Sequence, residues 1–364
     1  MKIICLQENL KNNLNLVQNI VGKNLTLPIL NNLLLQTENG KLKISATNLE
    51  IGINAWTAGK IEKEGAITCP AKIFYNFVNN LPNKKIEISA KDNNLIIKCE
   101  NYKANLKGLP ADDFPIIPKI KDTPLFEIES DKFKEALTQV VGMAALSESR
   151  PEISGILLKI EKNNLILAAT DSFRLAEKTI NDLMLNKKEQ SLIIPQRTIL
   201  ELIRILEGKE NLKVVLGNNQ ILFETSGTQL ISRIIDGQYP DYQQIIPKNF
   251  ATQVIIKKEE FLNSVRLASF FSSKINDIKL VFNSGKMEII SQSPDLGENR
   301  SLLTPNIKGK DLEISFNYKY ILDGLNNIFS SDIFLGFNSS DQPMIMRSVE
   351  KNDYLYVVMP IKSV

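Results

Sequence analysis

The sequence predicts an α+β fold built from three similar domains, each with two helices packed on antiparallel sheets. A strand followed by an amphipathic helix recurs three times, a tight hairpin follows each of these helices, and Pro-rich stretches at 109–118 and 239–247 separate the segments. At 364 residues the chain is too long for one ordinary hydrophobic core. We therefore expect domains at 1–123, 124–250 and 251–364.

Each segment opens with a strand and a helix. The strand-like runs lie at 3–6, 125–128 and 254–256, and apolar residues three or four positions apart follow each run. These residues are Leu10, Leu14 and Val17, then Phe133, Leu137 and Val140, then Phe261, Val265 and Ala268. Leu10 and Phe133 are 123 positions apart, and Phe133 and Phe261 are 128 apart, so one structural unit recurs along the chain.

A hairpin and a second helix complete each segment. The predicted turns are Asn39-Gly40, Asn163-Asn164 and Ser284-Gly285, which are residue types that tight hairpins require. Second helices are expected over 70–78, 195–206 and 317–328, and the first two begin at a Pro, which the start of a helix tolerates. Further strands close each segment, and the two helices can then cover one face of the strands.

Composition and charge exclude several classes of protein. No run approaches the roughly 18 apolar residues that span a bilayer, and the start lacks the pattern of a secretory signal, so a cytoplasmic location is expected. Cys5, Cys69 and Cys99 are too few for a disulfide framework and are expected as buried thiols. The absence of His excludes imidazole chemistry and the usual zinc sites, so we expect neither metal nor cofactor. With a net charge of only +3, any contact with nucleic acid depends on locally placed cations.

Five motifs resemble one known family. They lie at 26–34, 108–115, 169–176, 236–242 and 357–361, in order through all three expected domains. The sequence is similar to the bacterial DNA polymerase III beta subunits, the beta sliding clamps. The resemblance implies a non-catalytic processivity factor that forms a head-to-tail homodimer, a closed six-domain ring around duplex DNA with the helices facing the hole. Its implied partners are the polymerase alpha subunit, the clamp loader, repair polymerases and other proteins with clamp-binding tails.

In such a ring the polar faces of the helices would meet DNA. These faces carry the cations Lys11, Lys72, Lys132, Lys134, Arg197, Arg204, Lys258, Arg266 and Lys319. Phosphate contacts of this kind are independent of sequence, which suits sliding. The alternative is that these side chains only solvate exposed helix faces.

The resemblance also implies a pocket for partner peptides between the second and third domains. It carries that pocket onto Ile153, Thr170, Ser172, Arg174, Leu175, Pro240, Ile245, Val357, Met359, Pro360 and Ile361. The sequence departs from the family at Ser172-Phe173, at Gln243-Gln244 and in the tail at 361–364. The alternative for Leu175 and Met359 is plain core packing.

The ring seam is expected between the first domain of one chain and the third domain of the other. Phe270 and Phe271 are candidates to meet Ala104 and Leu106 across it, because aromatic side chains often anchor interfaces. Burial within their own domain is the alternative.

Two other functions stay open. An enzyme could use Asp112, Asp113, Asp171 and Asp241 as metal ligands or as acid and base. Their setting argues against this, because turns and caps explain them without catalysis and no phosphate-binding glycine loop is present. A β-rich surface scaffold would need neither DNA nor these cations. Salt-dependent retention on circular DNA separates a clamp from such a scaffold.

Overall fold

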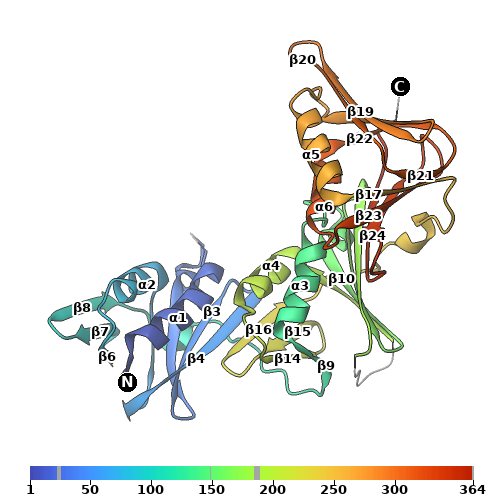
Figure 1. The fold of residues 1–364 in the computed structure, drawn as a ribbon. Coiled ribbons are helices and arrows are strands. Elements are labelled where there is room, and N and C mark those ends of the chain that lie inside the picture. Colours follow the sequence, from blue (N-terminus) through green and yellow to red (C-terminus); the bar gives the residue numbers. More distant parts are fainter. Residues whose placement is uncertain (23–25, 148, 184–188, 363–364) are drawn as a thin grey trace. The chain divides into compact units, whose positions relative to one another are not determined.

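The computed structural model describes residues 1–22, 26–147, 149–183 and 189–362 (Figure 1). The described chain forms two compact units. Unit 1 comprises residues 1–133 and 200–234, and unit 2 comprises residues 134–183, 189–199 and 235–362. Within the described residues, no helix is long and apolar enough to cross a membrane.

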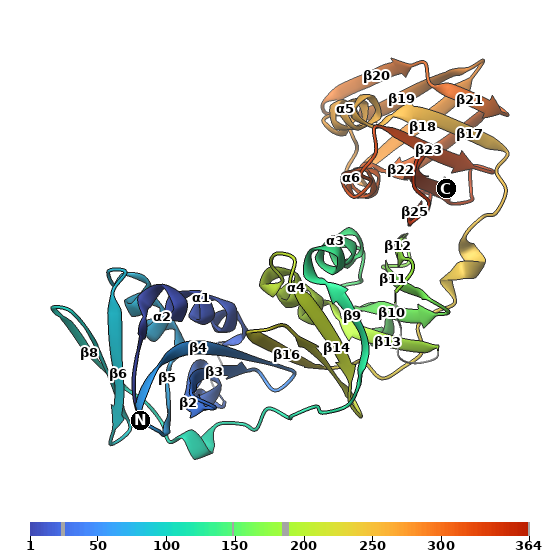
Figure 2. The same ribbon diagram turned by 60° about the horizontal axis from the view of Figure 1, so that its bottom comes forward.

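All six predicted helices are confirmed. They are α1 (Gln7–Val17), α2 (Ala71–Asn79), α3 (Ser130–Val141), α4 (Gln196–Ile205), α5 (Lys258–Ser269) and α6 (Tyr318–Asn326). In unit 1, α1 lies beside α2, and in unit 2, α5 lies beside α6 (Figures 1 and 2). Short 3-10 turns occur at Gln18–Ile20, Pro28–Asn31, Ala111–Asp113, Pro151–Ile153 and Tyr242–Ile245.

The strands of unit 1 form one antiparallel sheet. They are β1 (Lys2–Leu6), β2 (Asn32–Glu38), β3 (Lys41–Thr47), β4 (Ile51–Lys63), β5 (Ala66–Pro70), β6 (Lys85–Lys91), β7 (Asn94–Cys99), β8 (Tyr102–Lys107), β9 (Pro124–Glu129), β14 (Asn211–Leu216), β15 (Gln220–Glu224) and β16 (Thr228–Arg233). The main order is β8-β7-β6-β1-β4-β16-β15-β14-β9, and β3 links β2 and β5 to β4. Strands from both sides of the 109–118 stretch therefore share a sheet through β4 and β16.

The strands of unit 2 form two antiparallel sheets. They are β10 (Gly155–Glu161), β11 (Asn164–Thr170), β12 (Arg174–Ile180), β13 (Gln190–Pro195), β17 (Thr252–Lys257), β18 (Asp277–Asn283), β19 (Lys286–Ser293), β20 (Gly297–Leu303), β21 (Asn306–Gly309), β22 (Leu312–Asn317), β23 (Asp332–Phe337), β24 (Met344–Ser348) and β25 (Tyr354–Val358). The larger sheet runs β13-β10-β11-β12-β25-β24-β23-β17-β21, and the smaller runs β20-β19-β18-β22. The β12–β25 pair joins strands from both sides of the 239–247 stretch.

Two of the three predicted hairpin turns are confirmed and one is wrong by a residue. Asn39 and Gly40 have φ of 50° and 73°, and Ser284 and Gly285 have φ of 51° and 78°, the positive values that type I′ turns require. In the middle hairpin Glu161 pairs with Asn164, so the turn is Lys162-Asn163 and not Asn163-Asn164. The pairing of buried β10 and β11 side chains fixes this register, because a one-residue slip would turn every side chain to the opposite face.

Apolar helix stripes and strand faces meet in buried cores. Leu10, Phe133 and Phe261, which open the three repeats, are each fully buried. The three cysteines are free and buried, as predicted. Burial raises the pKa of the Cys5 thiol to about 12, and it raises the pKa of Cys69 as well.

Candidate functional site

A tight turn at 170–174 forms one rim of the candidate peptide groove in unit 2. Asp171 Oδ1 accepts hydrogen bonds from the backbone N–H groups of Phe173 (2.9 Å) and Arg174 (3.0 Å). Thr170 Oγ1 donates to the Arg174 carbonyl oxygen (2.7 Å) and accepts from the Ser172 N–H (3.1 Å). Ser172 has a φ of 78°. These bonds make an Asx turn, which explains Asp171 without catalysis.

The turn is tied to the C-terminal strand of the chain. Met359 donates its backbone N–H to the Phe173 carbonyl oxygen at 2.8 Å. Leu175 on β12 pairs with Val357 on β25. The fold therefore brings the 170–175 and 357–361 parts of the predicted pocket together.

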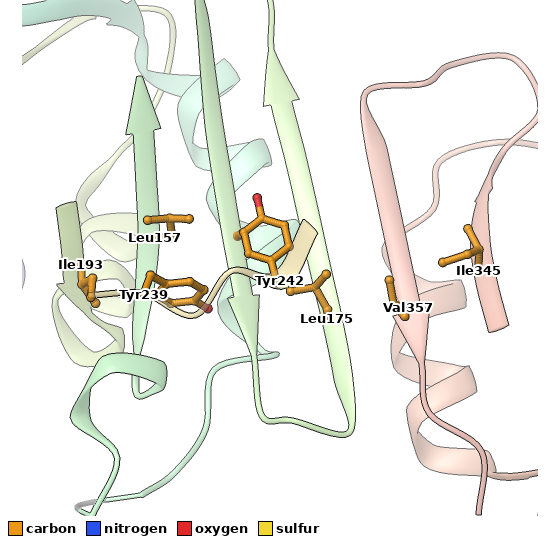
Figure 3. Packing of buried hydrophobic residues seen from close by; sticks show 8 residues of the cluster. Leu157, Leu175, Ile193, Tyr239, Tyr242, Ile345 and Val357 are labelled. Carbon is orange, nitrogen blue, oxygen red and sulfur yellow. The ribbon is translucent and has the colours of Figure 1, made fainter. Parts of the chain in front are cut away.

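An apolar cluster forms the floor beneath these residues (Figure 3). It comprises Leu157, Ala168, Leu175, Ile193, Tyr239, Tyr242, Ile345 and Val357. Leu175 and Val357 are each only 1% exposed, so they can act as floor and not as rim. The Tyr242 hydroxyl donates to Glu177 Oε2 at 2.5 Å, and its pKa is raised by burial and by the Glu177 charge.

The other predicted pocket residues differ in exposure. Ile153 and Thr170 are buried, and Pro240 and Ile245 are exposed. Met359, Pro360 and Ile361 are half-buried, and Ile361 donates its N–H to the Ser315 carbonyl oxygen at 2.8 Å. The tail residues Ser363 and Val364 lie outside the described residues.

An ionic and aromatic network that the sequence did not reveal supports the rim. Arg174 donates to Asp171 Oδ2 at 2.9 Å and also to Asp323 on α6. Its guanidinium lies over the Tyr320 ring, 4.7 Å from the ring centroid. The Phe173 ring stacks on the same Tyr320 ring, with 6.4 Å between the two centroids. Asp323 and Tyr320 come from a helix about 150 residues away in sequence, so no local motif could indicate them.

The predicted DNA-facing cations fall into two groups. Lys72, Arg197 and Lys319 are each the second residue of α2, α4 and α6, and all three are exposed. Lys132 and Arg266 are exposed as well, and Lys11 and Lys134 are half-buried.

Arg204 and Lys258 instead bind backbone carbonyls at helix ends. Arg204 donates to the Asn15 and Leu16 carbonyl oxygens at 3.0 and 2.5 Å, and to Glu201 at 2.8 Å. Lys258 Nζ donates to the Ile328 carbonyl oxygen at 3.0 Å.

The predicted seam residues lie at sheet edges. Ala104 and Leu106 are half-buried on β8, which ends the sheet of unit 1. Phe270, 69% exposed, and Phe271 follow α5, which packs against β20, the edge strand of the smaller sheet in unit 2. In the part of the chain that the structure describes, no group of three or more Cys, Asp or Glu is arranged to hold a metal ion.

Comparisons with known proteins identify the family. Models of the DNA polymerase III beta subunit match its N-terminal domain at residues 1–118, its central domain at 127–241 and its C-terminal domain at 243–362. The chain belongs to the DNA polymerase III beta subunit family. Members of this family are non-catalytic processivity factors, the beta sliding clamps.

Known beta sliding clamps match this chain along its whole length. Those of Bacillus subtilis and Synechocystis sp. are 28% and 29% identical to this chain, and each alignment covers 100% of both chains. The crystal structure of the DNA polymerase III subunit beta from Pseudomonas aeruginosa has a TM-score of 0.96, 27% identity and 100% coverage of both chains. A second structure from that organism, bound to griselimycin, has a TM-score of 0.95 at 27% identity and the same coverage.

Proposed function

We propose that two copies of this chain close into a ring around duplex DNA in the cytoplasm and tether DNA polymerase III to it. One observation carries the proposal. The internal repeat forms the same kind of strand pair twice within the chain, and the two strands that would form the third pair lie at sheet edges. In each repeat the third hairpin strand is β4, β12 or β20, and the last strand is β8, β16 or β25. The pairs β4–β16 and β12–β25 are formed within the chain, so β20 and β8 are left to pair between copies.

The two pairings within the chain give a register for the third. Ile53 pairs with Leu230 in unit 1, and Ala176 pairs with Tyr356 in unit 2. The equivalent positions of the other strands are Asn299 on β20 and Ala104 on β8. Both pairings are antiparallel, so carrying the same register onward places Arg300 opposite Lys103 and Ser301 opposite Tyr102.

Burial supports this register. Ala104 pairs with fully buried Ile97 on β7, and Asn299 pairs with buried Ser291 on β19, so both point toward a core. Phe270 and Phe271 follow α5, which packs against β20, so they are candidates to cover the seam. The ring would have domains at 1–123, 124–250 and 251–364, with each seam closed by β20 of one copy and β8 of the other.

Within the ring we assign DNA contact to the exposed helix cations. Lys72, Arg197 and Lys319 occupy the same position in three equivalent helices, so two copies would present six such cations. Arg204 and Lys258 contribute less, because their side chains already hold carbonyl groups. Contacts to phosphate without base contacts leave the ring free to slide.

We assign partner peptides to the groove bounded by the 170–174 turn, Pro240, Ile245 and 357–361. An apolar floor with a flexible Met at its rim suits short segments from several proteins, such as polymerase, clamp-loader and repair-protein tails.

The test is retention on nicked circular DNA after loading by the clamp loader of the same organism, compared with the same DNA after one restriction cut. A sliding ring should stay on the circle and leave the linear form, because only the circle lacks ends. Phosphate binding without encirclement would be indifferent to the cut. Equal retention on both forms would therefore refute the ring.

A further inference from the structure

Exposed charges of opposite sign alternate along the six helices. The second residue of α1, α3 and α5 is an acid, and the second residue of α2, α4 and α6 is a cation. The acids are Glu8, Asp131 and Glu259, and the cations are Lys72, Arg197 and Lys319. All six residues are exposed. In every repeat the first helix therefore begins with an exposed negative charge and the second helix begins with an exposed positive charge.

Helix stability does not explain this alternation. A carboxylate is favourable near the start of a helix and a cation is unfavourable there, because the helix dipole is positive at that end. The dipole alone would therefore favour an acid at the start of all six helices. Among the described helices, α2, α4 and α6 instead carry a cation at this position, and their first turns contain no acid. The alternation therefore indicates a role for these charges outside their own helices.

The two helices of each repeat run antiparallel. Gln7, the first residue of α1, donates its side-chain N–H to the Val78 carbonyl oxygen near the end of α2 at 2.8 Å. Gln196, the first residue of α4, donates to the carbonyl oxygen of Val141, the last residue of α3, at 2.9 Å. In the third repeat the first residue of α5 reaches the carbonyl oxygen two residues beyond α6, at 3.0 Å. The acid and the cation of a repeat therefore lie at opposite ends of the helix pair.

The acidic and basic ends are far enough apart to act on DNA separately. Each acid lies nine or ten residues before the end of its helix. At 1.5 Å per residue this is about 14–15 Å along the helix axis. Salt screens charges over about 8 Å at physiological ionic strength. Each carboxylate therefore has little effect on the basic end and acts mainly on charges at its own end.

Four cations that the sequence assigns to DNA share the acidic ends. Each lies within three residues of an exposed acid on the same helix, and they are Lys11, Lys132, Lys134 and Lys258. Opposite charges this close together lower the positive potential that a DNA phosphate meets. The acidic ends should therefore attract phosphate less than the basic ends.

We propose that Glu8, Asp131 and Glu259 keep DNA phosphates away from the acidic end of each helix pair, so that duplex DNA is held only at the basic end. The three acids act by repulsion and bind no ligand. This inference rests on the proposed ring, in which two copies would present six such acids. A ring that holds fewer phosphates at once has a weaker grip to break when it slides.

Neutralising the three acids tests this proposal. The test variant is Glu8→Gln, Asp131→Asn, Glu259→Gln. The matched control is Glu64→Gln, Asp122→Asn, Glu350→Gln, whose residues are exposed and lie outside the helices. Each set raises the formal net charge from +3 to +6, so a difference between the two variants cannot come from net charge.

The measurement is fluorescence anisotropy with a labelled blunt-ended duplex, whose open ends let a ring thread on without a clamp loader. At low salt the test variant should bind on the order of tenfold more tightly than the control. Its salt dependence should be steeper by about 0.9 for each phosphate that the acidic ends gain. After loading onto nicked circles and one restriction cut, the test variant should also leave the linear DNA more slowly than the control.

The outcomes separate this proposal from a structural role and from the ring itself. Equal affinities and equal salt slopes for the two variants would overturn the proposal and leave the acids as favourable helix starts only. Loss of a favourable helix start lowers the melting temperature, which a thermal melt measures, and does not tighten DNA binding. Equal retention of wild type on circular and linear DNA would refute the ring, and the anisotropy comparison would still decide whether the acids repel phosphate.

Discussion

Arg204 and Arg197 stand on the same helix, α4, and the structure gives them different surroundings. The Arg197 side chain is exposed, whereas the Arg204 guanidinium bonds to two carbonyl groups at the end of α1 and to Glu201. Carbonyls at a helix end carry partial negative charge, so a cation is favourable there. The sequence could not separate the two roles, because the accepting carbonyls lie almost 190 positions away.

These two arginines allow a paired substitution. Arg204→Ala should lower the free energy of unfolding by about 1–3 kcal/mol, because it removes charge-assisted hydrogen bonds. Arg197→Ala should leave stability within about 0.5 kcal/mol, because surface substitutions have small effects, and should weaken DNA binding. Urea denaturation and a DNA-binding titration measure the two effects. If Arg204→Ala were as stable as wild type, the observed hydrogen bonds would contribute nothing net.

The cysteines allow a prediction about pH. Because burial raises the Cys5 pKa from 9.0 to about 12, the native thiol stays protonated at pH values where an unfolded thiol ionises. Stability linked to Cys5 is therefore full below pH 9.0 and falls as the pH rises toward about 12. Native protein should resist iodoacetamide at pH 9, and protein in urea should react, as mass spectrometry of Cys5 would reveal. Rapid alkylation of Cys5 in the native protein would contradict its burial.

At the scale of elements, the sequence predicted the helices and hairpins that recur in each repeat, and it missed features that depend on residues far away in the chain. Helices and hairpins were predictable because apolar spacing and turn residues occur locally in all three segments. The middle turn was placed one residue late, because pairing across β10 and β11 sets it. The 170–174 motif indicated the rim of the proposed groove. Its supports, Asp323 and Tyr320, are contributed by α6, and no spacing rule connects them to the rim.

The two sheet edges allow a prediction about the seam. In the proposed register Lys103 and Arg300 stand directly opposite each other, and like charges in that position are unfavourable. Lys103→Glu should therefore tighten the dimer, by roughly two- to fivefold in Kd per seam at low salt, if each pair contributes about 0.5–1 kcal/mol. Sedimentation velocity across a dilution series measures the Kd of the dimer.

Two variants control this experiment. Lys91→Glu makes the same charge change at the exposed end of β6, away from β8, and should leave the Kd unchanged. Leu106→Asp should dissociate the dimer, because Leu106 pairs with fully buried Leu95 and the change places a charge on the core side of the seam. A Lys103→Glu dimer weaker than wild type would show that the register is wrong.

At the scale of the whole molecule, the position of charge matters more than its amount. The chain has a net charge of only +3, yet Lys72, Arg197 and Lys319 recur at one position of three equivalent helices. If these helices face DNA, removing the three cations should weaken DNA contact far more than removing three cations elsewhere. The two changes have the same effect on net charge, so any difference in DNA binding between the two variants results from the positions of the cations.

The variant Lys72→Ala, Arg197→Ala, Lys319→Ala tests this directly against the control Lys91→Ala, Lys213→Ala, Lys286→Ala, whose residues are exposed on strands. Each set lowers the formal net charge from +3 to zero. The salt dependence of DNA binding has a slope of roughly 0.9 per phosphate neutralised, so the helix variant should lose up to about five from the slope of a ring of two copies. The control should keep the slope of wild type. Equal slopes for the two variants would mean that these helix faces do not meet DNA, whatever the ring encloses. A decrease in slope confined to the helix variant would assign the inner surface of the clamp to these three positions.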